Sequence, residues 1–354
     1  MEKATIVTYP DDFAKQEIEE LAKAAGYSVA ALITQRQVLR SQYGVGVGKA
    51  EEIREIMKEN GSKVLIVDEE LRSSQTFNLA KVTKAEVIDR DRLILNIFAR
   101  RATTAEAKLQ VQLAELQYEI PRTKDAVRNS KTGERAGYMG IGELAVDVKF
   151  RALKRRMVTV KEKLDRAQSF RTLQRTERKK LDIPFVSLAG YTSSGKTTLF
   201  NKLAAESKEE SPDLFTTLTT TTRAVDLGGG GKKVLLSDTV GFISRLPTYM
   251  VESFKSTLAE LTYADLILLL LDASESEEAM RIKLGSCREI LKELSVDPGK
   301  VLLVLSKIDL AEEPVSGGLE GDRPFNDLSA MKVSAVRGDG LHQLRNRILS
   351  LTYP

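Results

Sequence analysis

An eight-residue stretch near the middle of the chain has the composition and spacing of a phosphate-binding loop. It begins at Gly190 and reads Gly-x-x-x-x-Gly-Lys-Thr. The glycines let backbone N–H groups converge on phosphate oxygens, and the start of the following helix adds positive potential. We expect Lys196 to reach the β- and γ-phosphates and the Thr197 hydroxyl to bind Mg²⁺. The candidate nucleotide-binding residues here are Gly190, Tyr191, Thr192, Ser193, Ser194, Gly195, Lys196, Thr197 and Thr198.

A second motif, Asp-x-x-Gly, begins at Asp238, two residues after the end of the short apolar run 234–236. We expect Asp238 to hold Mg²⁺ through a water molecule and the Gly241 N–H to contact the γ-phosphate, with Thr239 and Val240 between them. Phe242 follows, at a position where many GTPases place a glutamine that orients the attacking water. Because a phenylalanine cannot do this, we expect slow intrinsic hydrolysis.

A third motif, Ser306-Lys307-Ile308-Asp309, is similar to the guanine-reading Asn-Lys-x-Asp. Asp309 would accept hydrogen bonds from guanine N1–H and the exocyclic amine, and the Lys307 stem would pack on the base. Adenine lacks both donors, so the motif favours guanine. Ser306 stands where Asn is usual, yet its hydroxyl can still bridge to the phosphate loop. A Ser-Ala turn further on offers a backbone N–H to the guanine O6, from Ser334, Ala335 and Val336.

The segment 211–223 is rich in threonine. It can supply a hydroxyl to Mg²⁺ and a backbone N–H to a γ-phosphate, but spacing alone does not choose among its threonines. A β-prone linker is the alternative interpretation. The candidate residues are Phe215, Thr216, Thr217, Leu218 and Thr219.

These motifs require an α/β framework, and the hydrophobic pattern predicts one. In residues 181–354, apolar runs alternate with helical patterns, which indicates a mostly parallel sheet flanked by helices. The predicted strands cover 183–189, 234–236, 265–271, 301–305 and 331–333, and the predicted helices 198–203, 277–294 and 340–349. We expect this part to be a P-loop GTPase domain.

Residues 1–90 show the same alternation and predict a small parallel α/β domain. A turn carrying Gly44, Gly46 and Gly48 precedes a predicted helix at 50–57 and weakly resembles a dinucleotide loop, with Asp68 about twenty residues further on. A second nucleotide site or an RNA-phosphate site therefore stays open here. The alternative is a flexible loop that caps a helix.

Residues 91–180 predict a long helical hairpin. One helical pattern runs from Leu93 to Tyr118 and is expected to stop at Pro121. A second runs from Val146 into the 170s. The segment 122–142 between them, rich in glycine and basic residues, is expected to be a loop at the tip, either contacting a phosphate backbone or simply solvated.

The second of these helices is strongly basic. Residues 149–180 hold thirteen Lys or Arg and three acids, a net charge of +10, so the whole-chain charge of +4 leaves −6 for the remainder. Such one-signed charge is typical of nucleic-acid binding, although a solvated helix face is the alternative. Phe150 and Phe170 are the stretch's aromatic residues, so recognition of the RNA backbone is favoured over base stacking.

Composition excludes several other classes. One cysteine excludes an internal disulfide, and one histidine excludes a histidine metal cluster. The sequence lacks an apolar run long enough to span a membrane and an N-terminal signal segment. We therefore expect a cytoplasmic protein.

With the motifs in order, the chain resembles the HflX family of ribosome-associated GTPases, within the translation-factor class. The resemblance covers nearly the whole chain. Besides the motifs above, it depends on the segments 46–49, 88–90, 93–95, 97–99 and 121–122, and on the glycine-rich 137–143. The last reads Gly-Ile-Gly-Glu from Gly140, where the family has Gly-Pro-Gly-Glu. Two further departures are Thr219-Thr220 in place of Asp-Pro, and Ser306 in place of Asn.

The resemblance implies a GTPase that takes GTP/GDP and Mg²⁺ and binds the large ribosomal subunit and its rRNA through the N-terminal domain and helical arm. In bacterial members this is linked to splitting or rescuing stalled ribosomes. By the family pattern, Thr217 would be the Mg²⁺-sensing threonine, and Lys196, Thr217 and Gly241 the catalytic residues. We expect a monomer off the ribosome.

Two alternatives remain. One is a nucleotide-regulated RNA-binding or remodelling protein in which GTP turnover is incidental, a reading supported by Phe242. The other is an ATP-driven enzyme that uses the loop around Gly46 and Gly48.

Overall fold

The computed structural model describes residues 1–36, 42–132, 139–180, 183–205, 214–215, 220–228, 231–311 and 330–353, and the side chains of 126–145 and 168–180 are left out of the description. The chain forms two compact units, Met1–Asp165 and Arg166–Pro354. The division into domains 1–90, 91–180 and 181–354 stays a prediction.

The first unit is built around a four-stranded sheet in which every pairing is parallel, in the order β2-β1-β3-β4. All four residues of β3 are buried, as expected for a central parallel strand covered on both faces. The small parallel α/β domain is thereby confirmed. Its elements are β1 (Glu2–Thr8), α1 (Asp12–Ala24), β2 (Tyr27–Thr34), α2 (Val47–Asn60), β3 (Val64–Val67), α3 (Ser73–Thr83) and β4 (Glu86–Asp89).

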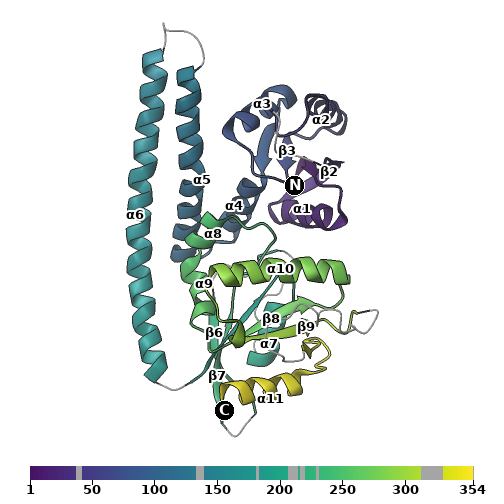
Figure 1. The fold of residues 1–354 in the computed structure, drawn as a ribbon, viewed down its shortest axis with the longest axis vertical. Coiled ribbons are helices and arrows are strands. Elements are labelled where there is room, and N and C mark those ends of the chain that lie inside the picture. The colour runs from purple at the N-terminus through teal and green to yellow at the C-terminus, as the bar shows by residue number, and fades with distance from the viewer. Residues whose placement is uncertain are drawn as a thin grey trace. The chain divides into compact units, whose positions relative to one another are not determined.

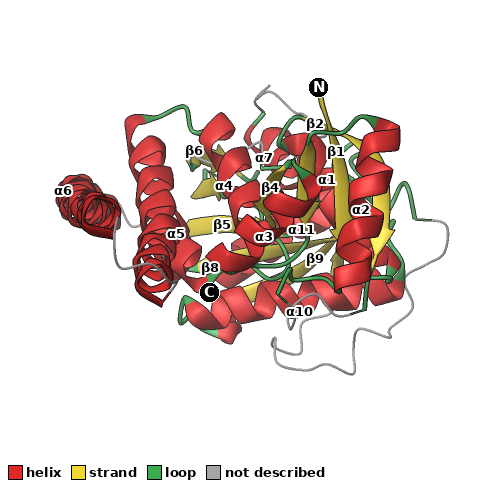
Figure 2. Cartoon of the chain, turned by 90° about the horizontal axis from the view of Figure 1, so that it is seen from above, coloured by secondary structure: helices red, strands yellow, loops and turns green. Residues whose placement is uncertain are grey.

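Helices α2 and α3 pack on each other (Figure 1). Helix α2 also packs on β2, and Figure 2 shows it beside the strands of this sheet. A buried apolar cluster joins them to the sheet, with Ile53 and Met57 from α2, Leu79 from α3, and Leu65 and Val67 from β3. Because Gly46 is the residue before α2, the glycine turn of the sequence starts this helix.

The helical region differs from its prediction in two ways. One predicted helix from Leu93 to Tyr118 is in fact two, α4 (Arg90–Arg101) and α5 (Ala105–Thr132). The break lies just before α5, where the Thr104 hydroxyl accepts a hydrogen bond from the Ala107 N–H at 3.2 Å, as an N-cap does. The predicted stop at Pro121 was also wrong, since α5 continues through Pro121 to Thr132.

The second long helix, α6 (Met139–Lys180), starts earlier than predicted, so the expected tip loop 122–142 is wrong in extent. Residues 133–138, in the middle of this expected loop, lie outside the described residues. Figure 1 shows α5 and α6 side by side. Their seam is apolar, because Leu113 and Leu116 of α5 form one buried cluster with Val160 and Leu164 of α6. The predicted pair of long packed helices is therefore present.

The second unit contains a six-stranded sheet in the order β10-β9-β8-β5-β7-β6. All pairings are parallel except β6 with β7. This confirms the α/β fold class, while the antiparallel edge strand β6 was not predicted. The strands are β5 (Phe185–Gly190), β6 (Thr221–Asp226), β7 (Lys233–Asp238), β8 (Leu266–Asp272), β9 (Val301–Ser306) and β10 (Met331–Lys332).

Helices cover both faces of this sheet, with α10 and α11 on opposite sides (Figure 1). Leu199 and Phe200 of α7 and Leu344 of α11 share one buried core with the strands. Helices α8 and α9, after β7, were not predicted. The helices are α7 (Lys196–Ala204), α8 (Thr248–Ser253), α9 (Lys255–Thr262), α10 (Glu277–Glu293) and α11 (Leu341–Thr352).

Within the part of the chain that the structure describes, we find no helix with the length and apolar character needed to cross a membrane.

Candidate active site

The phosphate-binding loop joins β5 to α7 in the arrangement that its sequence predicted. Gly190 ends the strand with a φ of +146°, and a Cβ built on it would lie 2.5 Å from the Leu270 carbonyl oxygen. Ser193 and Gly195 also have positive φ, at 61° and 82°. The turn therefore closes tightly enough to bring Lys196 to the first position of α7.

Lys196 is buried, and its amine faces the loop. Its Nζ donates to the carbonyl oxygens of Tyr191 at 2.6 Å and Gly190 at 3.1 Å. Burial lowers the pKa of Lys196 to about 8, and the nearby Asp238 carboxylate opposes this shift. A phosphate group placed here would favour the charged amine, so the residue is suited to binding an anion.

Thr197 and Asp238 meet beside this lysine. The Thr197 Oγ1 donates to the Asp238 Oδ2 at 3.0 Å, and Asp238 is fully buried at the end of β7. Thr239 is fixed in turn, since its hydroxyl donates to the Leu188 carbonyl at 2.6 Å. A hydroxyl and a carboxylate are hard oxygen donors, the ligands that Mg²⁺ prefers when phosphate oxygens and water complete its shell. The donor set therefore fits a magnesium ion.

The segment after Asp238 lies directly on the phosphate loop. A Cβ at Gly241 would lie 2.9 Å from the Thr192 Cγ2 and 3.2 Å from the Lys196 Nζ, so a larger residue would press on both. The Phe242 N–H donates to the Gly190 carbonyl at 3.0 Å, and the Thr192 N–H donates to the Phe242 carbonyl at 2.7 Å. These bonds join the two motifs through their backbones. The Phe242 side chain is buried in the interior of the second unit.

The candidate base-binding residues lie at the ends of β9 and β10. The Ser306 hydroxyl lies 2.8 Å from the Ser194 carbonyl oxygen, and this contact bears out the expected bridge to the phosphate loop. Lys307 has a φ of 56° and pairs with Asp272, Nζ to Oδ2, at 2.6 Å. A hydrogen bond with Ser334 lowers the pKa of Asp309, so this carboxylate is ionised at neutral pH.

The remaining predicted residues are only partly described. Phe215 is buried with a φ of 56°, whereas Thr216, Thr217, Leu218 and Thr219 lie outside the described residues. Ser334 is buried, and its N–H donates to the Asp339 carbonyl at 2.9 Å. Ala335 is half-buried and Val336 is exposed, and Thr198 and Ile308 are partly buried.

Comparison with known proteins matches three family descriptions to successive parts of the chain. They are the GTP-binding GTPase N-terminal region over residues 14–99, the GTP-binding GTPase middle region over residues 101–178, and the 50S ribosome-binding GTPase over residues 185–307. GTPase HflX of Thermococcus kodakarensis is 43% identical over 299 residues, which cover 84% of this chain and 67% of that protein. The chain belongs to the HflX family of GTPases.

Other members of the HflX family agree. GTPase HflX of Escherichia coli K12 is 38% identical over 335 residues, covering 93% of this chain and 76% of the relative. Among solved structures, a GTP-binding protein of Sulfolobus solfataricus in complex with GDP is 27% identical, with a TM-score of 0.52 and 99% of each chain covered. A second similar structure, that of the SsGBP and GDP complex, is 28% identical with a TM-score of 0.55, covering 99% of this chain and 98% of that one.

The sequence analysis did not identify two residues that support the HflX site, Lys283 and Asp272. The Tyr191 hydroxyl accepts the Ser244 N–H at 2.7 Å, and Lys283 of α10 lies over the Tyr191 ring at 4.9 Å. The second residue that was not identified is Asp272, which pairs with Lys307. The position of Asp272 at the end of a buried strand was a usable signal. Nothing in the local sequence marked Lys283, because it comes from a helix 92 residues away from Tyr191 in sequence.

The second nucleotide site left open in the N-terminal domain is not supported. Asp68, the candidate ribose ligand, is fully buried. Its Oδ1 accepts from Arg90 at 2.6 Å and its Oδ2 from the Thr8 hydroxyl at 2.6 Å. A ribose would have to displace this ion pair. The glycine turn also precedes α2, after the second strand of the domain, whereas a dinucleotide loop follows the first.

Proposed function

We propose that this chain is a GTP-dependent switch that associates with the large ribosomal subunit through its rRNA. Helix α6 carries the argument. Between residues 149 and 166 every Lys and Arg of this helix is exposed, eight in all, beside Glu162 and Asp165. The opposite, buried side holds the apolar seam with α5, so the basic face is presented to solvent. The family description of a 50S ribosome-binding GTPase supports the same partner.

We propose the following nucleotide roles for the residues of the site. Lys196 binds the β- and γ-phosphates, and the Gly241 N–H contacts the γ-phosphate. Thr197 and Asp238 would hold a magnesium ion, Asp238 through water, and Thr217 would complete this set when GTP is bound. When bound, the ion neutralises phosphate charge during hydrolysis. Asp309 reads the guanine N1–H and amine while the Ser334 to Val336 turn offers an N–H to O6.

We further propose that intrinsic hydrolysis is slow. The buried Phe242 is held by backbone bonds to Gly190 and Thr192, and its apolar ring cannot orient water. A group from the ribosome or from elsewhere in the chain would then have to supply this function. The expected biological outcome is the splitting or rescue of stalled ribosomes by a cytoplasmic protein that is monomeric off the ribosome.

Cosedimentation with purified large subunits tests the partner. Lys154→Gln, Arg155→Gln and Lys161→Gln together remove three exposed charges from α6, and the matched control removes three from the second unit, at Lys232, Lys255 and Lys292. With a non-hydrolysable GTP analogue, we expect the α6 variant alone to lose binding, and its salt dependence to fall by roughly two to three in log–log slope. Equal binding by both variants would contradict the role of α6.

The buried Phe242 also favours a second candidate, an RNA-binding or remodelling protein in which GTP turnover is incidental. This protein would bind rRNA equally with GTP and GDP. Cosedimentation in the two nucleotide states separates the candidates, because the switch requires tighter binding in one of them.

A further inference from the structure

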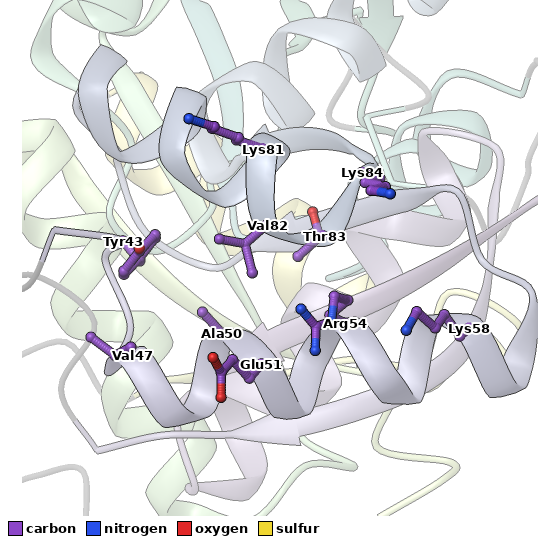
Figure 3. A pocket seen from close by; sticks show the side chains of 10 residues that line it. All are labelled: Tyr43, Val47, Ala50, Glu51, Arg54, Lys58, Lys81, Val82, Thr83 and Lys84. Carbon is purple, nitrogen blue, oxygen red and sulfur yellow. The ribbon is translucent and has the colours of Figure 1, made fainter.

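A groove in the first unit concentrates positive charge far along the chain from the nucleotide motifs. It lies between α2 and α3 and has a volume of about 510 Å³ (Figure 3). Four of its lining side chains are cationic and one, Glu51, is acidic. The cations are Arg54, Lys58, Lys81 and Lys84. We call this feature the α2/α3 groove.

Helix geometry explains why four cations line one space. Arg54 and Lys58 are four residues apart on α2 and so lie on one face. Lys81 is in the last turn of α3, and Lys84 is the next residue after that helix, in the left-handed conformation with φ 54°. The Lys84 N–H donates to the Ala80 carbonyl at 2.9 Å, which fixes this end of α3. Each wall therefore contributes two positive charges.

These charges are only partly neutralised. Glu55 pairs with the Lys58 Nζ at 3.0 Å and with the Arg54 Nε at 2.9 Å, and these contacts lower the pKa of Glu55. All three side chains are substantially exposed, so solvent screens the pairs. Among the ion pairs of the described residues, none involves Lys81 or Lys84, and both are exposed. The groove thus keeps an excess of positive charge.

An exposed aromatic residue lies on the same helix. Phe77 of α3 is 68% exposed, and it is one helical turn before Lys81, so the two share a face. A large exposed ring gains little from folding, but it provides a surface on which a base can stack. Cations combined with an exposed ring are typical of surfaces that bind single-stranded nucleic acid.

We propose that the α2/α3 groove binds the phosphate backbone of single-stranded RNA and that Phe77 stacks on one of its bases. Lysine and arginine recognise phosphate charge, and the four cations that line the groove favour a phosphate backbone over an apolar ligand. The identity of the RNA as ribosomal rests on the proposed function, whereas the phosphate binding does not. The groove would be a contact separate from the basic face of α6.

Fluorescence anisotropy with a single-stranded oligouridine of about twelve nucleotides tests the groove in the full chain, across a range of salt. Lys81→Gln with Lys84→Gln should weaken binding about tenfold and reduce the log–log salt slope by about 1.4, for two lost phosphate contacts on a single strand. The matched control, Lys23→Gln with Lys63→Gln, removes two exposed lysines outside the groove and should leave both quantities unchanged. Phe77→Ala should weaken binding about tenfold without changing the slope.

Wild-type binding by the Lys81/Lys84 variant, with an unchanged circular dichroism spectrum, would overturn the proposal. So would saturable binding of inorganic pyrophosphate that the variant loses while its oligonucleotide binding stays intact, because the groove would then take a small phosphate ligand. Failure of the proposed function is a different result: the wild-type chain would not sediment with large subunits. Oligonucleotide binding that still depended on Lys81 and Lys84 would then continue to support the groove.

Discussion

Each of the two units has a parallel or mostly parallel sheet whose carboxyl edge carries buried aspartates, yet different partners bind the aspartates of the two edges. In the first unit, Asp68 directly follows β3 and Asp89 ends β4, and arginine side chains bind both aspartates. In the second unit, Asp238 ends β7 and meets a threonine hydroxyl beside a buried lysine. The carboxyl edge of a parallel sheet is a common place for a binding site. Here the partner of the aspartate distinguishes a structural edge from a functional one.

The first edge is closed by internal ion pairs. Arg90 is buried and binds both Asp68 and Glu17, each at 2.6 Å. Arg122 of α5 binds Asp89 and donates to the Leu71 carbonyl, and the Tyr118 hydroxyl donates to Asp89 at 3.0 Å. These contacts tie α4 and α5 to the sheet. The edge therefore holds the domain together and has no room for a ligand's charge.

At the carboxyl edge of the second unit's sheet, two glycines let the backbones approach closely, and a buried lysine supplies positive charge. Gly190 and Gly241 lie where side chains would meet neighbouring atoms within 3 Å, so the backbones approach without filling the site. Lys196 is held there by carbonyl oxygens, which are weaker partners for its charge than phosphate. A buried charge that is fully paired within the protein therefore stabilises the fold. A buried charge that is paired only with carbonyl oxygens is suited to binding a ligand of opposite charge.

Arg90→Ala should give the largest effect. It leaves Asp68 and Glu17 buried without their counter-charge, which should lower the free energy of unfolding by about 3–5 kcal/mol. The matched control is Arg92→Ala, because Arg92 pairs with Glu115 at 3.8 Å on a partly exposed surface and should lose less than about 1 kcal/mol. Denaturant unfolding of the first unit measures both. Similar losses for the two variants would mean that the first edge is not held by its ion pairs.

Lys196→Met should have the opposite character, damaging activity and sparing the fold. Removing the phosphate-binding charge should reduce GTP turnover by about 10²–10³-fold, roughly 3–4 kcal/mol. Because the lysine is buried with a lowered pKa, its replacement by an apolar side chain should not lower the free energy of unfolding of the second unit. Turnover and unfolding are measured on the same preparation. A large decrease in the free energy of unfolding would show that Lys196 stabilises the fold, as the ion pairs of the first unit do.

Asp309→Asn tests the base-reading end of the second edge. The change removes a charged acceptor for guanine, so GTP affinity should fall by about 1.5–3 kcal/mol. ATP binding, weak from the start, should not change. Isothermal titration with both nucleotides checks this, and a loss shared equally by GTP and ATP would argue against guanine reading by Asp309.

Tyr118→Phe should have the smallest effect, about 1 kcal/mol, because it removes one hydrogen bond to Asp89. Burial, with the Asp89 charge, raises the pKa of Tyr118 above its usual 10. Below pH 10 this stabilisation is complete, and it is lost as the pH rises because the unfolded tyrosine releases its proton first. The wild-type free energy of unfolding should therefore fall more steeply above pH 10 than that of the variant. Parallel curves would show that Tyr118 is not coupled to this edge.

Local sequence predicted the second edge well and the first edge poorly. The phosphate loop, Asp238 and the Ser306 motif each depend on residues within a few positions of one another, and strand–loop–helix context supplied the rest. The ion pairs of Arg90 depend on Glu17, 73 residues away, and on Asp68, 22 residues away. No local pattern marks such contacts, so Asp68 was considered for a ribose when its partner was an arginine.

Two helix boundaries could also not be predicted from the local sequence. Pro121 was taken as a stop because proline removes one backbone hydrogen bond and crowds the preceding turn. The helix continues, and the adjacent Arg122 is held by Asp89 and stacks on Tyr118 at 3.8 Å. These tertiary contacts compensate for the local loss. Near Thr104 the apolar pattern continues across a helix break, because α4 ends with Ala102 as its C-cap and the Thr104 hydroxyl then caps the start of α5.

The most direct test of the account is GTP turnover by the full chain, with and without purified large ribosomal subunits, at two salt concentrations. We expect slow turnover by the chain alone, a marked increase with subunits, and loss of that increase at high salt because the contact is electrostatic. Fast turnover by the chain alone, or turnover indifferent to subunits at both salt concentrations, would contradict it.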